Sequence, residues 1–246
     1  MKFNRKINPN NKTEHNFITK KRLKEDEIDF NKLRSYRLDR VKKELEKNNL
    51  EACILFDPVN IRYALDTVNM SVHNMHNLTR YCFVPIKGPV ILYEYFNCEK
   101  LSEHLNLIDE IRPAISWDYF GNGSQVDAKL KEWINEISDL SNSYFKSKKI
   151  AIDVLNGPAV LALDKIGIKV VDAKSILEKA RVIKSPEELK CMKAALEVAE
   201  IGVSKMRNQL KAGMTEDELW SILHKTNIEN GGEWIECRIL SSGVRT

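Results

Sequence analysis

The chain has 246 residues, of which 43% are hydrophobic and 30% charged, with 10 glycines and 7 prolines. This length allows one large domain or two modest ones, and the composition excludes collagen-like and wholly disordered chains. Five cysteines occur singly, with no CxxC pair, so the sequence predicts neither a disulfide framework nor a zinc ribbon and favours a reducing cytoplasm. No segment approaches the roughly 18 apolar residues of a membrane span, and no apolar leader is recognisable, so no membrane association is expected.

The net charge of +4 is unevenly distributed along the chain. Residues 1–24 contain eight Lys or Arg and one Glu, whereas the remaining 222 residues contain 31 basic and 34 acidic side chains. We interpret residues 1–28 as a basic, disordered tail. It lacks the interleaved aromatic residues and the reader motif typical of nucleic-acid binding, so nucleic acid is not an expected partner.

Residues 29–178 alternate between helical and strand-like patterns. A helix is predicted from Asp29, placed to cap its start, to about Asn48. Short apolar runs predict strands at 52–56, 81–84, 90–95, 108–112, 149–152 and 168–171. Further helices are predicted near 99–105, over 126–137, and from Gly157, while Asp57-Pro58 is read as a turn. This alternation predicts an α/β domain with a mixed sheet.

Residues 179–246 predict two helices and one strand. Ser185 and Thr215 each open a capping box, and Gly213 suits the left-handed residue that ends the first helix. The alternation over 233–240 predicts a strand. Because one strand cannot satisfy its own backbone hydrogen bonds, we interpret this region as an incomplete second domain.

Two groups of residues are candidates for binding chemistry. His73 and His76 stand three apart, a spacing that could place two imidazoles on one metal ion if the segment were helical. No carboxylate or cysteine lies nearby, so the alternative is a pair of polar loop residues. Trp117, Tyr119 and Phe120 either anchor a loop in the core or form a pocket wall whose aromatic faces attract a cation.

Several segments resemble one enzyme family. ARVIKSPEEL at 180–189 and LKAGMTEDEL at 210–219 resemble two helix junctions in the creatinase, aminopeptidase P and prolidase family, the pita-bread metallopeptidases. DPVNIRYA at 57–64 is similar to the signature of that family's N-terminal domain. The segment GGEWIECRILSSGVRT at 231–246, with Asn69-Met70 and Trp117–Phe120 upstream, looks closest to the branch that contains dimethylsulfoniopropionate lyases.

The resemblance implies a creatinase-like N-terminal domain over 29–178, followed by the start of a pita-bread catalytic domain over 179–246. In the family, two divalent metal ions are held by two Asp, one His and two Glu. The resemblance places all five after Thr246, so no catalytic residue or metal ligand is expected in this segment, and none of its residues is expected to bind a cofactor. The N-terminal domain implies a homodimer in which its loops face a neighbouring active site. The substrate-pocket candidates are Trp117, Tyr119, His73, His76 and Arg80, with Arg80 pairing a substrate carboxylate.

Two classes of function remain open. The full-length protein is either a metal-dependent enzyme, acting on Xaa-Pro peptides or releasing dimethyl sulfide from a sulfonium carboxylate, or a non-catalytic module for dimerisation or ligand binding. The chain itself is read either as a fragment of a longer protein or as a natural truncation. A continuation bearing the two Asp, the His and the two Glu would favour the enzyme.

Overall fold

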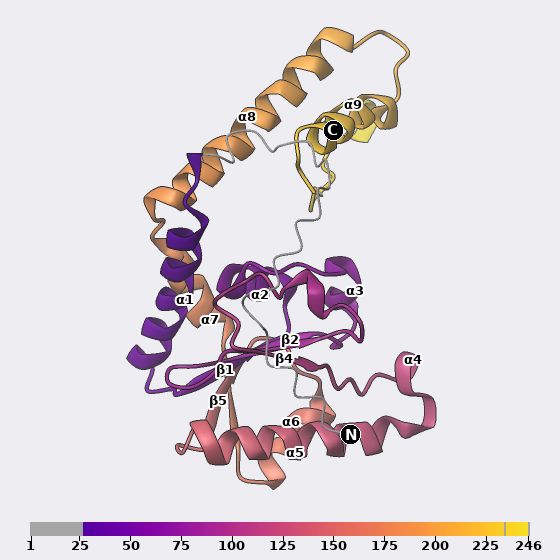
Figure 1. Ribbon diagram of the computed structural model, residues 1–246. Coiled ribbons are helices and arrows are strands. Elements are labelled where there is room, and N and C mark those ends of the chain that lie inside the picture. The colour runs from indigo at the N-terminus through magenta and orange to yellow at the C-terminus, as the bar shows by residue number, and fades with distance from the viewer. Residues whose placement is uncertain (1–26, 234, 246) are drawn as a thin grey trace. The chain divides into compact units, whose positions relative to one another are not determined.

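The computed structural model describes residues 27–233 and 235–245, which divide into two compact units (Figure 1). Unit 1 contains residues 34–183, and unit 2 contains the described residues up to Leu33 together with those from Lys184 onward. The predicted basic tail, apart from its last two residues, lies outside the described residues. No helix in the described ranges is both long and apolar enough to cross a membrane.

Unit 1 is built on a six-stranded mixed sheet of order β4-β3-β2-β1-β5-β6. The strands are β1 (Ala52–Leu55), β2 (Tyr81–Pro85), β3 (Ile91–Glu94), β4 (Glu110–Pro113), β5 (Lys149–Ile152) and β6 (Lys169–Asp172). β2 runs antiparallel to both β1 and β3, whereas the pairs β3–β4, β1–β5 and β5–β6 are parallel. Five strands therefore point the same way, and their carboxyl ends meet at one edge of the sheet.

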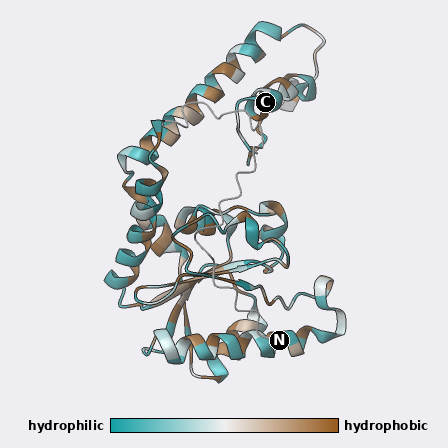
Figure 2. Ribbon diagram, viewed as in Figure 1, coloured by the Kyte–Doolittle hydropathy of each residue, from teal (hydrophilic) through white to brown (hydrophobic). Residues whose placement is uncertain are grey.

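Helices cover both faces of this sheet. The side chains of β1 point alternately to the two faces of the sheet. On one face, Cys53 and Leu55 pack in a core with α1 (Phe30–Lys47), α2 (Pro58–Leu65) and α7 (Lys174–Val182). Ile54 packs in a second core with α5 (Val126–Tyr144) and α6 (Gly157–Lys165). Figure 2 shows hydrophobic and hydrophilic residues alternating along α5, as expected of a helix with one face on a sheet.

The sequence predicted most of these elements, and the structure differs from the prediction at several of them. Asp57-Pro58 begins α2 instead of forming a simple turn: Asp57 accepts hydrogen bonds from the backbone N–H groups of Val59 and Asn60, and Pro58 occupies the first helical position. α7 was not predicted. The helix expected over 99–105 is only a short 3₁₀ helix at Glu99–Leu101, and α5 extends to Tyr144, seven residues beyond the predicted end.

Unit 2 pairs α8 (Pro186–Gln209) with α9 (Glu216–Glu229). Both predicted capping boxes are present, at Ser185 with Glu188 and at Thr215 with Glu218. The two helices approach closely at Gly202, where an added Cβ would lie 2.4 Å from Leu223 Cδ1. A larger residue at 202 would therefore force these helices apart.

The predicted strand over 233–240 is wrong for the residues that the structure describes. Residues 233 and 235–240 adopt irregular backbone, and Trp234 lies outside the described residues. The six-stranded sheet belongs entirely to unit 1, and the described part of unit 2 contains no strand that could pair with this segment. Local alternation alone does not make a strand, because its N–H and C=O groups need a neighbour.

Candidate functional site

The sequence candidates all lie near the edge of unit 1 where the five strands end. The segments that follow β1, β3, β4 and β5 meet there, and β2 begins there. In open α/β sheets this edge is where ligands bind. Its exposed side chains include a set of apolar residues that we call the apolar rim: Val68, Met70, Val72, Met75, Phe96, Tyr119 and Phe120.

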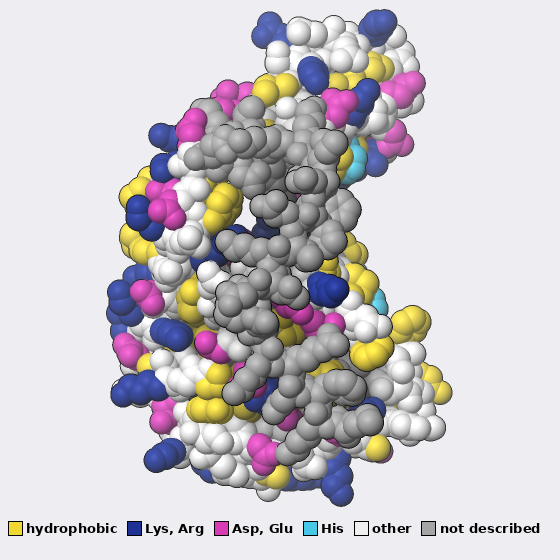
Figure 3. Space-filling view, viewed as in Figure 1, with side chains coloured by type: hydrophobic (Ala, Val, Ile, Leu, Met, Phe, Trp, Pro, Cys, Tyr) yellow, Lys and Arg dark blue, Asp and Glu magenta, His cyan; other side chains and the backbone are white. Residues whose placement is uncertain are grey.

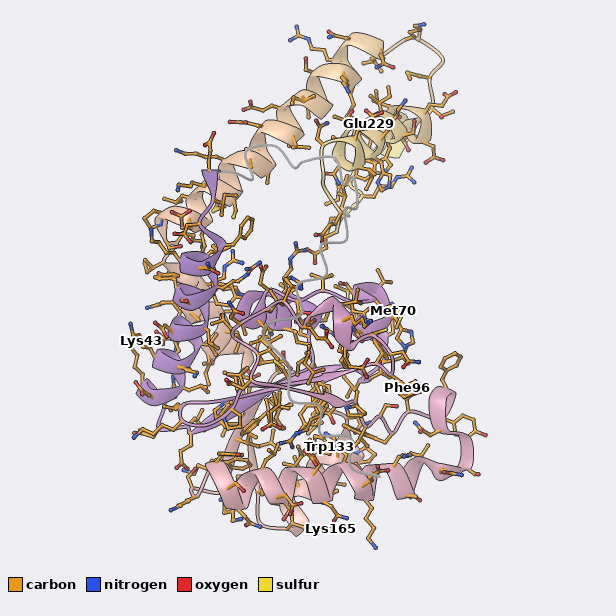
Figure 4. The ribbon with its side chains drawn as sticks, viewed as in Figure 1. Lys43, Met70, Phe96, Trp133, Lys165 and Glu229 are labelled. Atoms are coloured by element: carbon orange, nitrogen blue, oxygen red, sulfur yellow. The ribbon has the colours of Figure 1, made fainter. Side chains whose placement is uncertain are left out.

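The apolar rim is visible on the surface. Figure 3 shows hydrophobic side chains in yellow and a histidine in cyan at the edge where Figure 1 places α3 (Ser71–His76) and α4 (Tyr119–Asn122). Figure 4 labels Met70 and Phe96 at this same edge, whereas Trp133 lies between the sheet and α5. Phe96 is 80% exposed, so an aromatic ring projects from the loop after β3 into solvent.

His73 and His76 lie on one short helix, as the metal hypothesis required, but they have different surroundings. The His73 ring lies 6.3 Å from the ring of Tyr95 and 6.5 Å from that of Phe120, measured between centroids. Asn77 lies beside it, with Nδ2 3.3 Å from His73 Nδ1. His76 is exposed. The structure therefore joins His73, and not His76, to the aromatic residues.

Trp117 and its neighbours Tyr119 and Phe120 separate in the structure. Trp117 is 3% exposed, its ring lies 4.5 Å from that of Trp133 between centroids at a tilt of 39°, and its Nε1–H donates to Asn156 Oδ1 at 3.2 Å. It is part of the core between the sheet and α5. Tyr119 and Phe120 are 77% and 86% exposed. Of the two readings given above, the core anchor describes Trp117, whereas Tyr119 and Phe120 are exposed and the pocket wall stays a prediction for them.

Arg80 lies inside unit 1 and is paired with a carboxylate of the protein itself. It is therefore not placed to pair a substrate carboxylate, as was expected. Only 1% of its side chain is exposed, and its Nε donates to Glu94 Oε2 at 2.9 Å, while Glu94 itself is fully buried. Its Nη2 donates to Thr67 Oγ1 at 2.7 Å. The sequence did not reveal this ion pair. Glu94 is the last residue of β3 and comes close to Arg80 only when the sheet has formed.

A second carboxylate, that of the partly buried Asp153, lies at this same edge. Asp153, directly after β5, accepts hydrogen bonds from Phe56 N at 2.8 Å, Asp57 N at 3.2 Å and Asn60 Nδ2 at 2.9 Å. Burial raises the pKa of Asp153 above its ordinary value, against the opposing effect of these hydrogen bonds. The contacts tie the start of α2 to the end of β5.

Sequence reasoning missed Tyr95, Phe96, Met70 and Asn69 as members of this region. Tyr95 donates its hydroxyl to Asn74 Oδ1 at 2.5 Å, and burial raises the pKa of its phenol, with smaller effects of the nearby Glu94 and Asp118 carboxylates in the same direction. The available signal was the position of Tyr95-Phe96 directly after a buried strand, at the ligand-binding edge of an α/β sheet.

The described residues do not fit a metal centre. Within residues 27–233 and 235–245, no three His, Cys, Asp or Glu side chains are grouped so that they could hold a metal ion. His73 and His76 supply two nitrogens without a carboxylate beside them. The geometry at this edge can instead bind an apolar or cationic group, because exposed aromatic faces attract cations.

The fold defines a class, the α/β layer domain with helices on both faces of a mixed sheet. Comparison of the sequence with known protein families identifies the family. Residues 37–183 match the creatinase/prolidase N-terminal domain. The chain belongs to this family.

Its curated relatives include two proteins named dimethylsulfoniopropionate lyase DddP, from Roseobacter denitrificans and Roseovarius nubinhibens. Each is 34% identical over 224 residues, which cover 89% of this chain and 50% of the relative. The chain thus spans about half the length of the curated relatives it matches.

Solved structures with a similar fold include an Xaa-Pro dipeptidase from Bacillus anthracis, with a TM-score of 0.58, 15% identity, and coverage of 80% of this chain and 49% of that one. A prolidase from Thermococcus sibiricus has a TM-score of 0.59, 17% identity, and coverage of 81% and 50%. At these identities the likeness is one of fold.

Proposed function

We propose that the chain is the N-terminal part of a metal-dependent enzyme of the creatinase/prolidase family that cleaves dimethylsulfoniopropionate. The observation that carries this proposal is the 34% identity that runs along 89% of the chain to two proteins named as such lyases. The fold likeness to peptidases, at 15% and 17% identity, supports the family without favouring peptide substrates. We further propose that the protein is a cytoplasmic homodimer joined through this domain.

The proposed reaction is an elimination. A base removes a proton from the carbon next to the substrate carboxylate, the electron pair of that C–H bond forms a C=C bond, and the C–S bond breaks with its electrons leaving on sulfur. The products are acrylate and dimethyl sulfide. A metal ion, when bound, stabilises negative charge that develops on the carboxylate side. The residues that would hold this metal belong, in this proposal, to the half of the relatives' length that the chain does not match.

The described residues support a binding role in this reaction. A sulfonium group is a cation with apolar methyl substituents, and the apolar rim offers both methyl contacts and aromatic faces. Each aromatic contact with a cation is worth about 0.5–2 kcal/mol. Tyr119 and Phe120 replace Trp117 as the aromatic residues available for this contact, because Trp117 is buried.

A non-catalytic module for dimerisation or ligand binding is the second candidate. One observation favours it: the described residues carry the exposed apolar rim. Binding by this surface requires no chemistry. The two candidates differ in whether the complete protein turns over a substrate.

The test uses the complete protein encoded by the full reading frame, loaded with Mn, Fe, Zn or Co. Dimethyl sulfide release from dimethylsulfoniopropionate is measured by gas chromatography, and hydrolysis of Xaa-Pro dipeptides is measured in parallel. We expect dimethyl sulfide release and no dipeptide hydrolysis, with the 246-residue chain as an inactive control. Dipeptide hydrolysis alone would assign the protein to the peptidases, and neither reaction in the metal-loaded protein would favour the binding module.

A further inference from the structure

The segment from Asp66 to Asn77 has its polarity inverted relative to an ordinary surface loop. Its apolar side chains face solvent: Val72 is 60% exposed, Met70 51% and Met75 42%. Polar side chains beneath it are buried, with Thr67 3% and Asn74 2% exposed. Exposing a group of apolar side chains costs free energy, and it is common at sites that bind a ligand or partner, so this arrangement is not explained by the stability of the loop itself.

The buried carboxylate of Glu94 holds this segment from below. Its Oε1 accepts hydrogen bonds from Asn69 Nδ2 at 3.0 Å and from Tyr95 N at 2.9 Å, and its Oε2 accepts from Arg80 Nε at 2.9 Å. Arg80 in turn donates to Thr67, whose hydroxyl lies 2.5 Å from that of Ser102. One ion pair between neighbouring strands thus anchors the loop at both Thr67 and Asn69.

A second set of hydrogen bonds fixes α3 to the same anchor. Asn74 Nδ2 donates to the carbonyl oxygen of Asn69 at 2.7 Å, and Asn74 Oδ1 accepts from the Tyr95 hydroxyl. The Thr79 hydroxyl lies 2.6 Å from that of Tyr95. Asn74, which lies on α3, is therefore hydrogen-bonded to Asn69 and to Tyr95. Asn69 in turn donates to Glu94, and Tyr95 directly follows Glu94 in the chain.

Met70, the residue between the two anchors, has a strained backbone. Its φ of 40° and ψ of 49° are left-handed, a region that costs a residue with a Cβ about 1 kcal/mol or more. The strain persists because Asn69 and Asn74 are held on either side. Strain of this kind is concentrated at functional sites, where the surrounding structure enforces one conformation.

We propose that Asn69, Arg80 and Glu94 are positioning residues that hold residues 66–77 in one conformation, so that the apolar rim is preformed for the cationic head group of the substrate. The ligand class rests on the proposed function. A buried ion pair contributes little net stability compared with apolar residues of the same volume, and in some proteins such a pair instead enforces one conformation. Apart from the ion pair itself, the hydrogen bonds of Arg80 and Glu94 go to Thr67 and Asn69, in residues 66–77, and to the backbone N–H of Tyr95.

The position of the aromatic residues favours a cation over a neutral apolar group. Phe120 and Tyr95 flank His73, and the carboxylate of Asp118 is close enough to Tyr95 to raise the pKa of its phenol. Aromatic faces next to a carboxylate attract onium groups. His73 contributes a third ring, held by α3.

The test compares Asn69→Ala with Tyr63→Phe in the complete protein. Both remove a side-chain hydrogen bond within unit 1, but the hydroxyl of Tyr63 donates to the Ala180 carbonyl oxygen on α7, whereas Asn69 donates to Glu94. For Asn69→Ala we expect amide exchange in residues 66–77 about tenfold faster, a KM for dimethylsulfoniopropionate raised about tenfold and a kcat within about twofold, since a hydrogen bond to a charged acceptor is lost. Tyr63→Phe is expected to change neither the exchange nor the KM.

Two measurements separate the failure of this inference from the failure of the proposed function. Unchanged amide exchange of residues 66–77 in Asn69→Ala refutes the positioning role whatever the reaction is. If the complete protein hydrolyses Xaa-Pro dipeptides instead, the lyase proposal fails, and a raised KM for the dipeptide in Asn69→Ala would still support positioning. Faster exchange with an unchanged KM for the active substrate refutes the link between the loop and binding. Arg80→Lys, which keeps the charge, is expected to retain more protection than Asn69→Ala.

Discussion

Replacing Arg80 by methionine tests the buried ion pair directly. The variant keeps most of the side-chain volume but leaves the carboxylate of Glu94, which is fully buried, without its cation. Removing one partner of a buried pair costs about 3–5 kcal/mol. Unit 1 spans 34–183. For a unit of about 150 residues, an unfolding entropy of roughly 2.1 cal/mol/K per residue converts this loss into a decrease in Tm of about 10–15 °C.

The assay is thermal unfolding followed by circular dichroism, with the double variant Arg80→Met/Glu94→Gln as the matched control. Glutamine keeps an acceptor oxygen for Asn69 and Tyr95 but carries no charge, so the double variant is expected to recover more than half of the lost Tm. A single variant that melts within about 3 °C of the parent protein, which corresponds to about 1 kcal/mol, would refute the argument. So would a double variant that is no more stable than the single one.

Three further predictions concern the core, a titrating group and a helix start. Trp117→Ala is expected to lower the free energy of unfolding, measured in urea, by about 3–5 kcal/mol. Phe120→Ala, at an exposed site, is expected to change it by less than about 0.5 kcal/mol. Equal effects of the two variants would place Trp117 outside the core. Because the folded-state pKa of Asp153 is raised, the native state binds its proton more tightly than the unfolded state, so its contribution to stability is greatest below pH 3.8 and falls as the pH rises toward the folded-state value. The free energy of unfolding of the parent minus that of Asp153→Asn, measured in urea, should therefore decrease as the pH rises, and a parent that gains stability relative to the variant would contradict this. Ser185→Ala is expected to cost about 1 kcal/mol and to speed amide exchange in the first turn of α8, while unchanged exchange there would show that the capping box contributes nothing.

Local signals in the sequence were enough for α1, α5, α6, α8 and α9 and for the central strands, but not for α2, α3, α4 and α7. The capping boxes at Ser185 and Thr215 were predicted and are confirmed, because every group involved lies within four residues of the others. The strands β2 and β3 and the boundaries of β5 were predicted from short apolar runs between turn residues. The family was predicted as well, since its motifs are contiguous in the chain.

The structure decided what each candidate site residue does. Trp117 and Tyr119 are two residues apart, yet one lies in the core and the other in solvent, because α5 covers only one of them. Arg80 is occupied because Glu94 lies on the strand beside it. The alternation at 233–240 did not produce a strand within the described residues, since pairing depends on a neighbour. Local patterns determine which elements the sequence can form, whereas burial and partnership arise from residues that only the fold brings together.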